Sequence, residues 1–71
     1  MDSFLEFVAG IFRVPATSLS EDTAYGSIPQ WDSLMQLRLV AEVEDHYGVE
    51  IAIDEVPNIR TLGDLHRLIS E

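Results

Sequence analysis

The sequence predicts an all-α fold, a small four-helix bundle of three main helices and one short helix. Helical spacing of apolar residues and capping signals mark residues 3–13, 33–47 and the stretch after residue 61. The 71 residues fit one domain, residues 1–71, and without cysteine the core must come from side-chain packing. Residues 49–54 alternate like a strand, but a single strand would have no partner in this chain.

The first helix is expected over residues 3–13, where Asp2 or Ser3 can cap it before a run of apolar residues at helical spacing. Residues 14–32 then contain prolines, serines and a glycine without a sustained period, which predicts a long surface connection. A loop of that length in a small domain is usually functional or internally packed. Its expected anchors in the core are Leu19, Tyr25, Ile28 and Trp31.

The second helix, residues 33–47, is the longest, with Asp32 as its N-cap and Gly48 at its left-handed C-terminal position. Leu37 and Ala41 fall one and two turns after Ser33 on the same face, which suggests a small docking surface. The stripe expected to face the core contains Leu39, Val40, Val43 and Tyr47.

The last part of the chain predicts an extended link, a short helical turn and a final helix. The turn is expected over residues 53–56 and should stop near Pro57. Thr61 and Asp64 have capping-box spacing, with Asp in place of the usual Glu or Gln. The apolar residues of the final helix are Leu62, Leu65, Leu68 and Ile69.

The charge balance restricts the possible partners. Thirteen acidic and four basic residues give a formal charge of −9, which repels nucleic acid and anionic membranes and favours basic proteins. The apolar segment 4–12 is too short to span a bilayer and lacks a basic leader. We therefore expect a cytoplasmic protein without membrane insertion. The alternative explanation of the acidic charge is that it only increases solubility.

No catalytic or metal constellation is evident. His46 follows Ser33 by thirteen residues on one helix, which places it roughly 20 Å away, too far to activate the serine. His66 is expected to be a surface or half-buried helix residue. The acidic residues of the second helix lack the spacing of a metal cage, and no glycine-rich phosphate loop is present. The sequence thus predicts a non-enzyme without a metal.

Ser33 stands at a helix start, where unpaired N–H groups and the helix dipole stabilise a phosphate esterified to its hydroxyl. A serine with no base of its own can still be modified when a separate enzyme supplies activation. The alternative is that Ser33 is an ordinary first-turn residue, since serine is common there.

The order of motifs resembles the acyl carrier protein family over nearly the whole chain. The resemblance lies in Asp32-Ser33-Leu34 after a long loop, the following helix, the Ile51-Ala52-Ile53 link and a short capped last helix. It implies that Ser33 receives 4′-phosphopantetheine from coenzyme A through a phosphopantetheinyl transferase. The thiol of the arm then holds acyl groups as thioesters.

The resemblance also implies roles for the neighbours of Ser33. Asp32 would assist the metal-bound complex of the transferase, and Leu34 would be gripped by partner enzymes. We expect a monomer whose partners are acyl-loading, ketosynthase or acyltransferase enzymes with basic docking patches. The expected partner-binding residues are Leu34, Leu37, Ala41, Glu42, Glu44 and Asp45.

Two departures from primary fatty-acid carriers favour a specialised, polyketide-like pathway. Met35 and Arg38 interrupt the acidity of the helix start, and Trp31 precedes the motif. A primary fatty-acid carrier, an aminoacyl or peptidyl carrier and an acidic interaction module without a prosthetic group remain as alternatives. The paired glycines often found before the modified serine of peptidyl carriers are absent.

Overall fold

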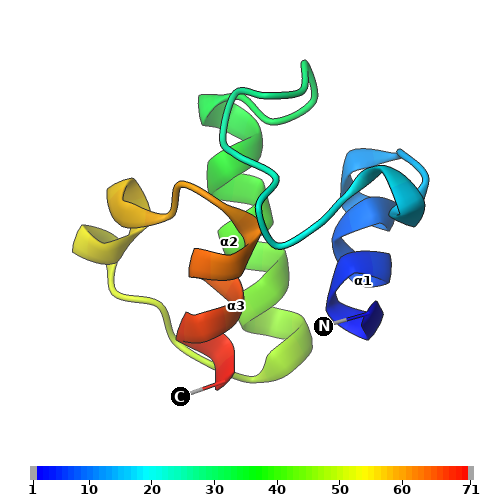
Figure 1. Ribbon diagram of the computed structural model, residues 1–71. Coiled ribbons are helices and arrows are strands. Elements are labelled where there is room, and N and C mark those ends of the chain that lie inside the picture. The colour runs from blue at the N-terminus through cyan, green and yellow to red at the C-terminus, as the bar shows by residue number, and fades with distance from the viewer. Residues whose placement is uncertain (1, 71) are drawn as a thin grey trace.

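The computed structural model describes residues 2–70 and is built from helices. Three α-helices, α1 (Asp2–Phe12), α2 (Ser33–Tyr47) and α3 (Leu62–Ser70), are joined by segments with the 3₁₀-helices η1 (Ala16–Ser18) and η2 (Ile53–Asn58). In Figure 1, α2 runs through the centre, with α1 on one side and η2 on the other. The described residues form no strand beyond one isolated bridge, which confirms the all-α prediction.

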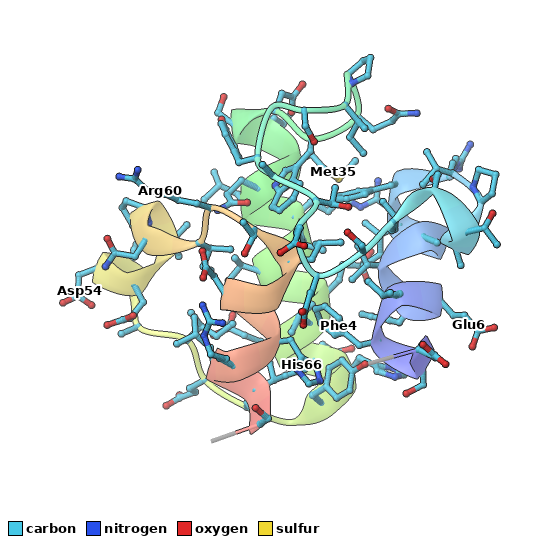
Figure 2. The ribbon with its side chains drawn as sticks, viewed as in Figure 1. Phe4, Glu6, Met35, Asp54, Arg60 and His66 are labelled. Carbon is cyan, nitrogen blue, oxygen red and sulfur yellow. The ribbon has the colours of Figure 1, made fainter. Side chains whose placement is uncertain are left out.

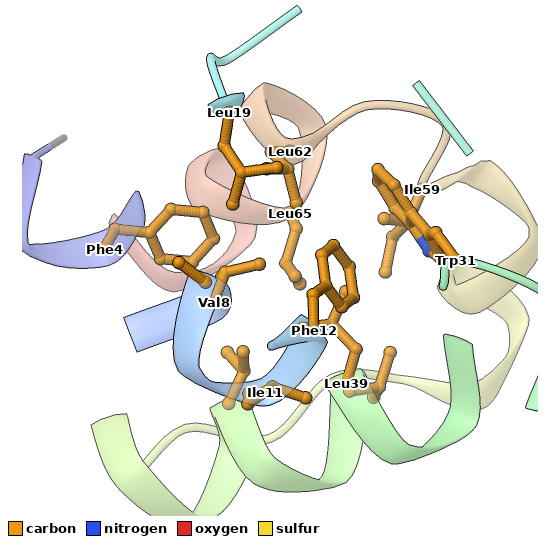
Figure 3. Packing of buried hydrophobic residues seen from close by; sticks show 13 residues of the cluster. Phe4, Val8, Ile11, Phe12, Leu19, Trp31, Leu39, Ile59, Leu62 and Leu65 are labelled. Atoms are coloured by element: carbon orange, nitrogen blue, oxygen red, sulfur yellow. The ribbon is translucent and has the colours of Figure 1, made fainter. Parts of the chain in front are cut away.

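The core lies where α1, α2 and α3 meet, and Figure 3 shows its packing. Leu39, Val40 and Val43 of the predicted inner stripe of α2 are buried, whereas Tyr47 is half-buried at its edge. Desolvation by this burial raises the pKa of Tyr47 above its usual value. The other buried apolar residues are Phe4, Val8, Ala9, Ile11, Phe12, Leu19, Trp31, Ile59, Leu62 and Leu65.

Helix α1 begins and ends one residue earlier than its apolar spacing suggests. It stops because Arg13 adopts a left-handed conformation, with φ of 61°, while the Val14 N–H donates to the Ala9 carbonyl at 3.1 Å. This is the arrangement in which a glycine usually ends a helix. Arginine carries a Cβ that crowds this conformation, so the position is strained.

The loop between α1 and α2 is fastened to the start of α3 by backbone hydrogen bonds. The Tyr25 N–H donates to the Arg60 carbonyl at 2.7 Å, and Leu62 N–H donates to Thr23 at 3.1 Å. Gly63 N–H donates to the Glu21 carbonyl at 2.8 Å, and a Cβ on Gly63 would lie only 3.1 Å from that oxygen. The long loop is therefore internally packed.

Two details of this loop differ from the sequence prediction. It contains the short helix η1, closed by a hydrogen bond from Ser18 N–H to the Pro15 carbonyl at 3.0 Å. Leu19 and Trp31 are buried anchors as expected, and Ile28 is half-buried. Tyr25 was expected in the core, but 43% of it is exposed; its ring and that of Trp31 form a T-shaped pair, with 6.0 Å between ring centres.

The short helix η2 continues through Pro57 to Asn58, beyond the predicted stop. A 3₁₀-helix tolerates this residue because its usual φ matches that of proline. Backbone bonds from Glu55 N–H to Ala52 and from Ile59 N–H to Val56 close its two ends, at 2.9 and 3.2 Å.

Helix α3 starts with the predicted capping box. The Thr61 hydroxyl accepts from Asp64 N–H at 3.1 Å, and Asp64 accepts from Thr61 N–H at 3.2 Å. A further hydrogen bond from Arg60 N–H is the main reason that the pKa of Asp64 lies below its usual value; the charge of Arg67, which pairs with it, adds to the effect. The shorter aspartate therefore serves in place of glutamate.

Candidate functional site

Ser33 is the first residue of α2, and its side chain is exposed. Asp32 caps the helix, because its Oδ1 accepts from Met35 N–H at 2.8 Å while its carbonyl accepts from Gln36 N–H, also at 2.8 Å. Within residues 2–70, nothing hydrogen-bonds the Ser33 hydroxyl or accepts from the N–H groups of Ser33 and Leu34. The site thus offers a free hydroxyl beside the positive end of a helix dipole.

The residue before the motif is part of the core. Trp31 is fully buried, and its ring centre lies 5.6 Å from that of Phe12 of α1. The backbone N–H of Trp31 donates to the Ile28 carbonyl at 3.1 Å, and the Trp31 carbonyl accepts from the Gly26 N–H at 3.2 Å. Trp31 thereby fixes where the loop turns into α2, so packing explains its presence next to the serine.

The side chain of Gln36 links three segments around the site. Its Oε1 accepts from the Trp31 indole Nε1 at 2.6 Å. Its Nε2 donates to the carbonyls of Val56 and Ile59, each at 3.1 Å. Gln36 is the buried polar side chain of the described core, with 8% exposed, and these bonds satisfy it. Figure 3 shows the side chains of Trp31 and Ile59, the two residues that Gln36 connects, next to each other in the core.

An open groove of about 670 Å³ runs from Ser33 between α2 and η2. Its walls include Leu37 of α2 and Pro57 of η2, and Gln36 lies among its lining residues. A second hollow of about 600 Å³ lies on the other side of Leu37, next to Asp32 and Leu34. Leu34 and Leu37 are 77% and 60% exposed and form an apolar ridge one turn long, in which Leu37 lines both hollows and Leu34 lines the second.

The acidic residues of α2 differ in their local partners. Glu42 pairs with Arg38 across one turn at 3.4 Å on the exposed surface. Glu44 accepts from the Ile51 N–H at 2.7 Å and so holds the link that leads to η2. Asp45 is exposed, as is Ala41. Asp45 therefore keeps its charge for solvent or a partner, whereas Glu44 also has a role inside the domain.

Neither histidine approaches Ser33. His46 stacks on Phe7 of α1, with ring centres 4.1 Å apart, and His66 of α3 meets Phe4 edge-on at 5.0 Å. Figure 2 shows Phe4 and His66 together at the end of the bundle far from the start of α2. Within residues 2–70, no three His, Asp or Glu side chains are grouped so that they could hold a metal ion.

Sequence reasoning missed two residues of this region. Gln36 lies three residues after Ser33, and a polar residue between apolar ones on a helix gave no indication of burial. Ile53, at the start of η2, is 87% exposed. In an extended link, residues 51 and 53 point to the same side, so no sequence pattern indicated that Ile53 is exposed while Ile51 is half-buried.

None of the helices that the structure describes combines the length and the apolar composition that a bilayer span requires.

Comparison with known proteins agrees with this geometry. The family described as phosphopantetheine attachment site matches residues 2–69. The acyl carrier protein of Lactobacillus acidophilus is 32% identical over 59 residues, which cover 83% of this chain and 74% of that protein. Members of this family are carriers, not catalysts, and they bear covalently attached 4′-phosphopantetheine. Their partners are the phosphopantetheinyl transferase and acyl-processing enzymes. The chain belongs to the acyl carrier protein family.

Proposed function

We propose that Ser33 is the attachment residue and that residues 1–71 act as one carrier domain. The observation that carries this proposal is the exposed Ser33 hydroxyl, free of internal hydrogen bonds, at the start of α2. The unpaired N–H groups of Ser33 and Leu34 stabilise the negative charge of a phosphodiester there. The terminal thiol of the bound arm supplies the thioester linkage to an acyl group.

In the attachment step, the Ser33 oxygen loses its proton and forms a phosphoester bond with the phosphate of the pantetheine arm, while the pyrophosphate bond of coenzyme A breaks and adenosine 3′,5′-bisphosphate leaves. Because both histidines pack against α1, the base that receives this proton belongs to the transferase. Asp32 uses Oδ1 to cap α2, and Oδ2 has no hydrogen-bond partner among the described residues. This arrangement supports a role for Oδ2 in assisting the metal-bound complex of the transferase, while the other oxygen keeps the helix start in place.

The proposed partner face combines the ridge beside Ser33 with the acidic residues farther along α2. Leu34, Leu37 and the exposed Ala41 supply apolar contact. Glu42, Glu44 and Asp45 supply negative charge that raises encounter rates with basic patches on ketosynthase, acyltransferase or acyl-loading enzymes. Such a face suits weak, transient complexes, which a carrier must leave after each step.

The proposed pathway is a specialised, polyketide-like one, in a cytoplasmic and monomeric carrier. Its support is Arg38, whose positive charge lies one turn from Glu42 on the exposed surface and lowers the net negative charge of α2. Met35 is a further uncharged residue in the first turn of α2. Trp31 adds no weight to this choice, because its burial gives it a structural role. Primary fatty-acid synthesis and aminoacyl transfer are the alternatives that a cargo measurement would separate.

The test is modification by coenzyme A and a promiscuous phosphopantetheinyl transferase, followed by intact-protein mass spectrometry. We expect one arm on the wild-type chain and none on Ser33→Ala. The matched control is Ser27→Ala, which removes another exposed serine hydroxyl, one that donates to the Ala24 carbonyl at 2.6 Å. An unmodified wild type with several transferases would instead indicate an interaction module without a prosthetic group.

A further inference from the structure

Gln36 lies on α2 between the exposed Ser33 and the buried core. Ser33 and Gln36 line the same groove, and the buried Leu39 lies one turn deeper on α2. The two Nε2 bonds of Gln36 hold the end of η2 against α2, and its Oε1 holds Trp31. Both donors and the acceptor of one side chain are thus engaged at a single point.

Parting α2 from η2 at this point would have a specific cost. Both bonds from Gln36 Nε2 to the Val56 and Ile59 carbonyls would break, while the bond between the Trp31 indole and Gln36 Oε1 would stay on the α2 side. An apolar chain offers no replacement for these two bonds, so the Gln36 Nε2 group and the Ile59 carbonyl would be buried without partners. Contact between an alkyl chain and the core would have to overcome this penalty.

We propose that Gln36 determines the cargo of this carrier: its linkage keeps apolar acyl chains out of the bundle and favours short or polar acyl groups. This inference rests on the proposed attachment at Ser33. The acyl group lies in the open groove, where Leu37 and Pro57 contact its first carbons while the rest meets water. A longer acyl chain then adds little to the stability of the folded domain, whereas an acyl chain buried in the interior would stabilise it more with every added carbon.

The experiment uses wild-type protein loaded at Ser33 with butyryl, hexanoyl, octanoyl and decanoyl pantetheine arms, each confirmed by mass spectrometry. We expect the melting temperature to vary by less than about 3 °C across the series. We also expect retention on a hydrophobic-interaction column to increase with every added pair of carbons. A chain buried in the interior would raise the melting temperature by about 10 °C or more from butyryl to decanoyl and would flatten the retention series.

Gln36→Leu removes the linkage, and Gln30→Leu makes the same change on an exposed loop residue as the matched control. We expect the melting temperature of Gln36→Leu to rise with chain length, while Gln30→Leu follows the wild type. A wild type that is already stabilised by the decanoyl arm would overturn the proposal even if Gln36→Leu does not fold. Failure to load any arm would contradict the attachment at Ser33 instead, so the two failures are distinguishable.

Discussion

The hydrogen bond between Trp31 and Gln36 should stabilise the folded domain measurably. Gln36→Leu keeps a side chain of similar size but removes all three hydrogen bonds of the amide. The Val56 carbonyl retains the Ile59 N–H at 3.2 Å, so the groups left without a partner are the Trp31 indole N–H and the Ile59 carbonyl. Each buried unpaired group costs about 1–3 kcal/mol.

Water in the groove can reach part of this cluster, so we expect a total loss of about 2–4 kcal/mol in the free energy of unfolding. For a domain of this size, that corresponds to a melting temperature lower by about 10–20 °C. The assay is urea unfolding followed by far-ultraviolet circular dichroism. Gln30→Leu, on the exposed loop, should remain within about 0.5 kcal/mol of the wild type.

A double-mutant cycle isolates the bond itself. Trp31→Phe removes the indole donor, and the cycle with Gln36→Leu should give a coupling energy of about 1–2 kcal/mol. The two single changes share the 2.6 Å contact, so their effects should not add. A coupling energy within about 0.3 kcal/mol of zero, or a Gln36→Leu variant as stable as the wild type, would refute this reasoning.

Four further changes test other parts of the structure. Leu39→Ala, at a fully buried position, should lower the free energy of unfolding by about 2–5 kcal/mol; an unchanged urea midpoint would argue against its place in the core. Arg13→Gly should raise the free energy of unfolding by about 1 kcal/mol, because glycine adopts the left-handed conformation without strain; thermal melting would report the change. The pKa of Asp64 is lowered on folding, so its contribution is present above the unfolded value of about 3.9 and disappears as pH falls through the folded value. Asp64→Asn should therefore lose stability at neutral pH and differ less from the wild type in acid; a constant difference from pH 7 to pH 2 would contradict this. Replacing Glu42 and Asp45 by Lys should slow partner association at low salt without changing the melting temperature, and equal stopped-flow rates would exclude steering by these charges.

Features set by neighbouring residues were predictable from the sequence. Asp32 and Gly48 mark the ends of α2 because a side-chain acceptor and a left-handed glycine act within one turn of the helix. Thr61 and Asp64 mark the start of α3 for the same reason. Ser33 could be singled out because its place at a helix start follows from the residues that come directly after it.

Features set by distant segments were not predictable in this way. The exposure of Tyr25 follows from the pairing of its loop with Arg60, which is remote in sequence. The burial of Gln36 depends on carbonyls of Val56 and Ile59 that only the folded chain brings near it. Glu44 was expected on the partner face from the resemblance to acyl carrier proteins, and its bond to the Ile51 N–H depends on the path of the link.

Trp31 also gives the protein an internal optical reporter. It is the only tryptophan in the 71 residues, it is fully buried, and its indole N–H is bonded to the side chain three residues beyond Ser33. Indole emission responds to the polarity and hydrogen bonding around the ring. The intrinsic fluorescence of the unlabelled chain therefore responds to changes in the groove that Ser33 and Gln36 line, in real time and without any engineered probe.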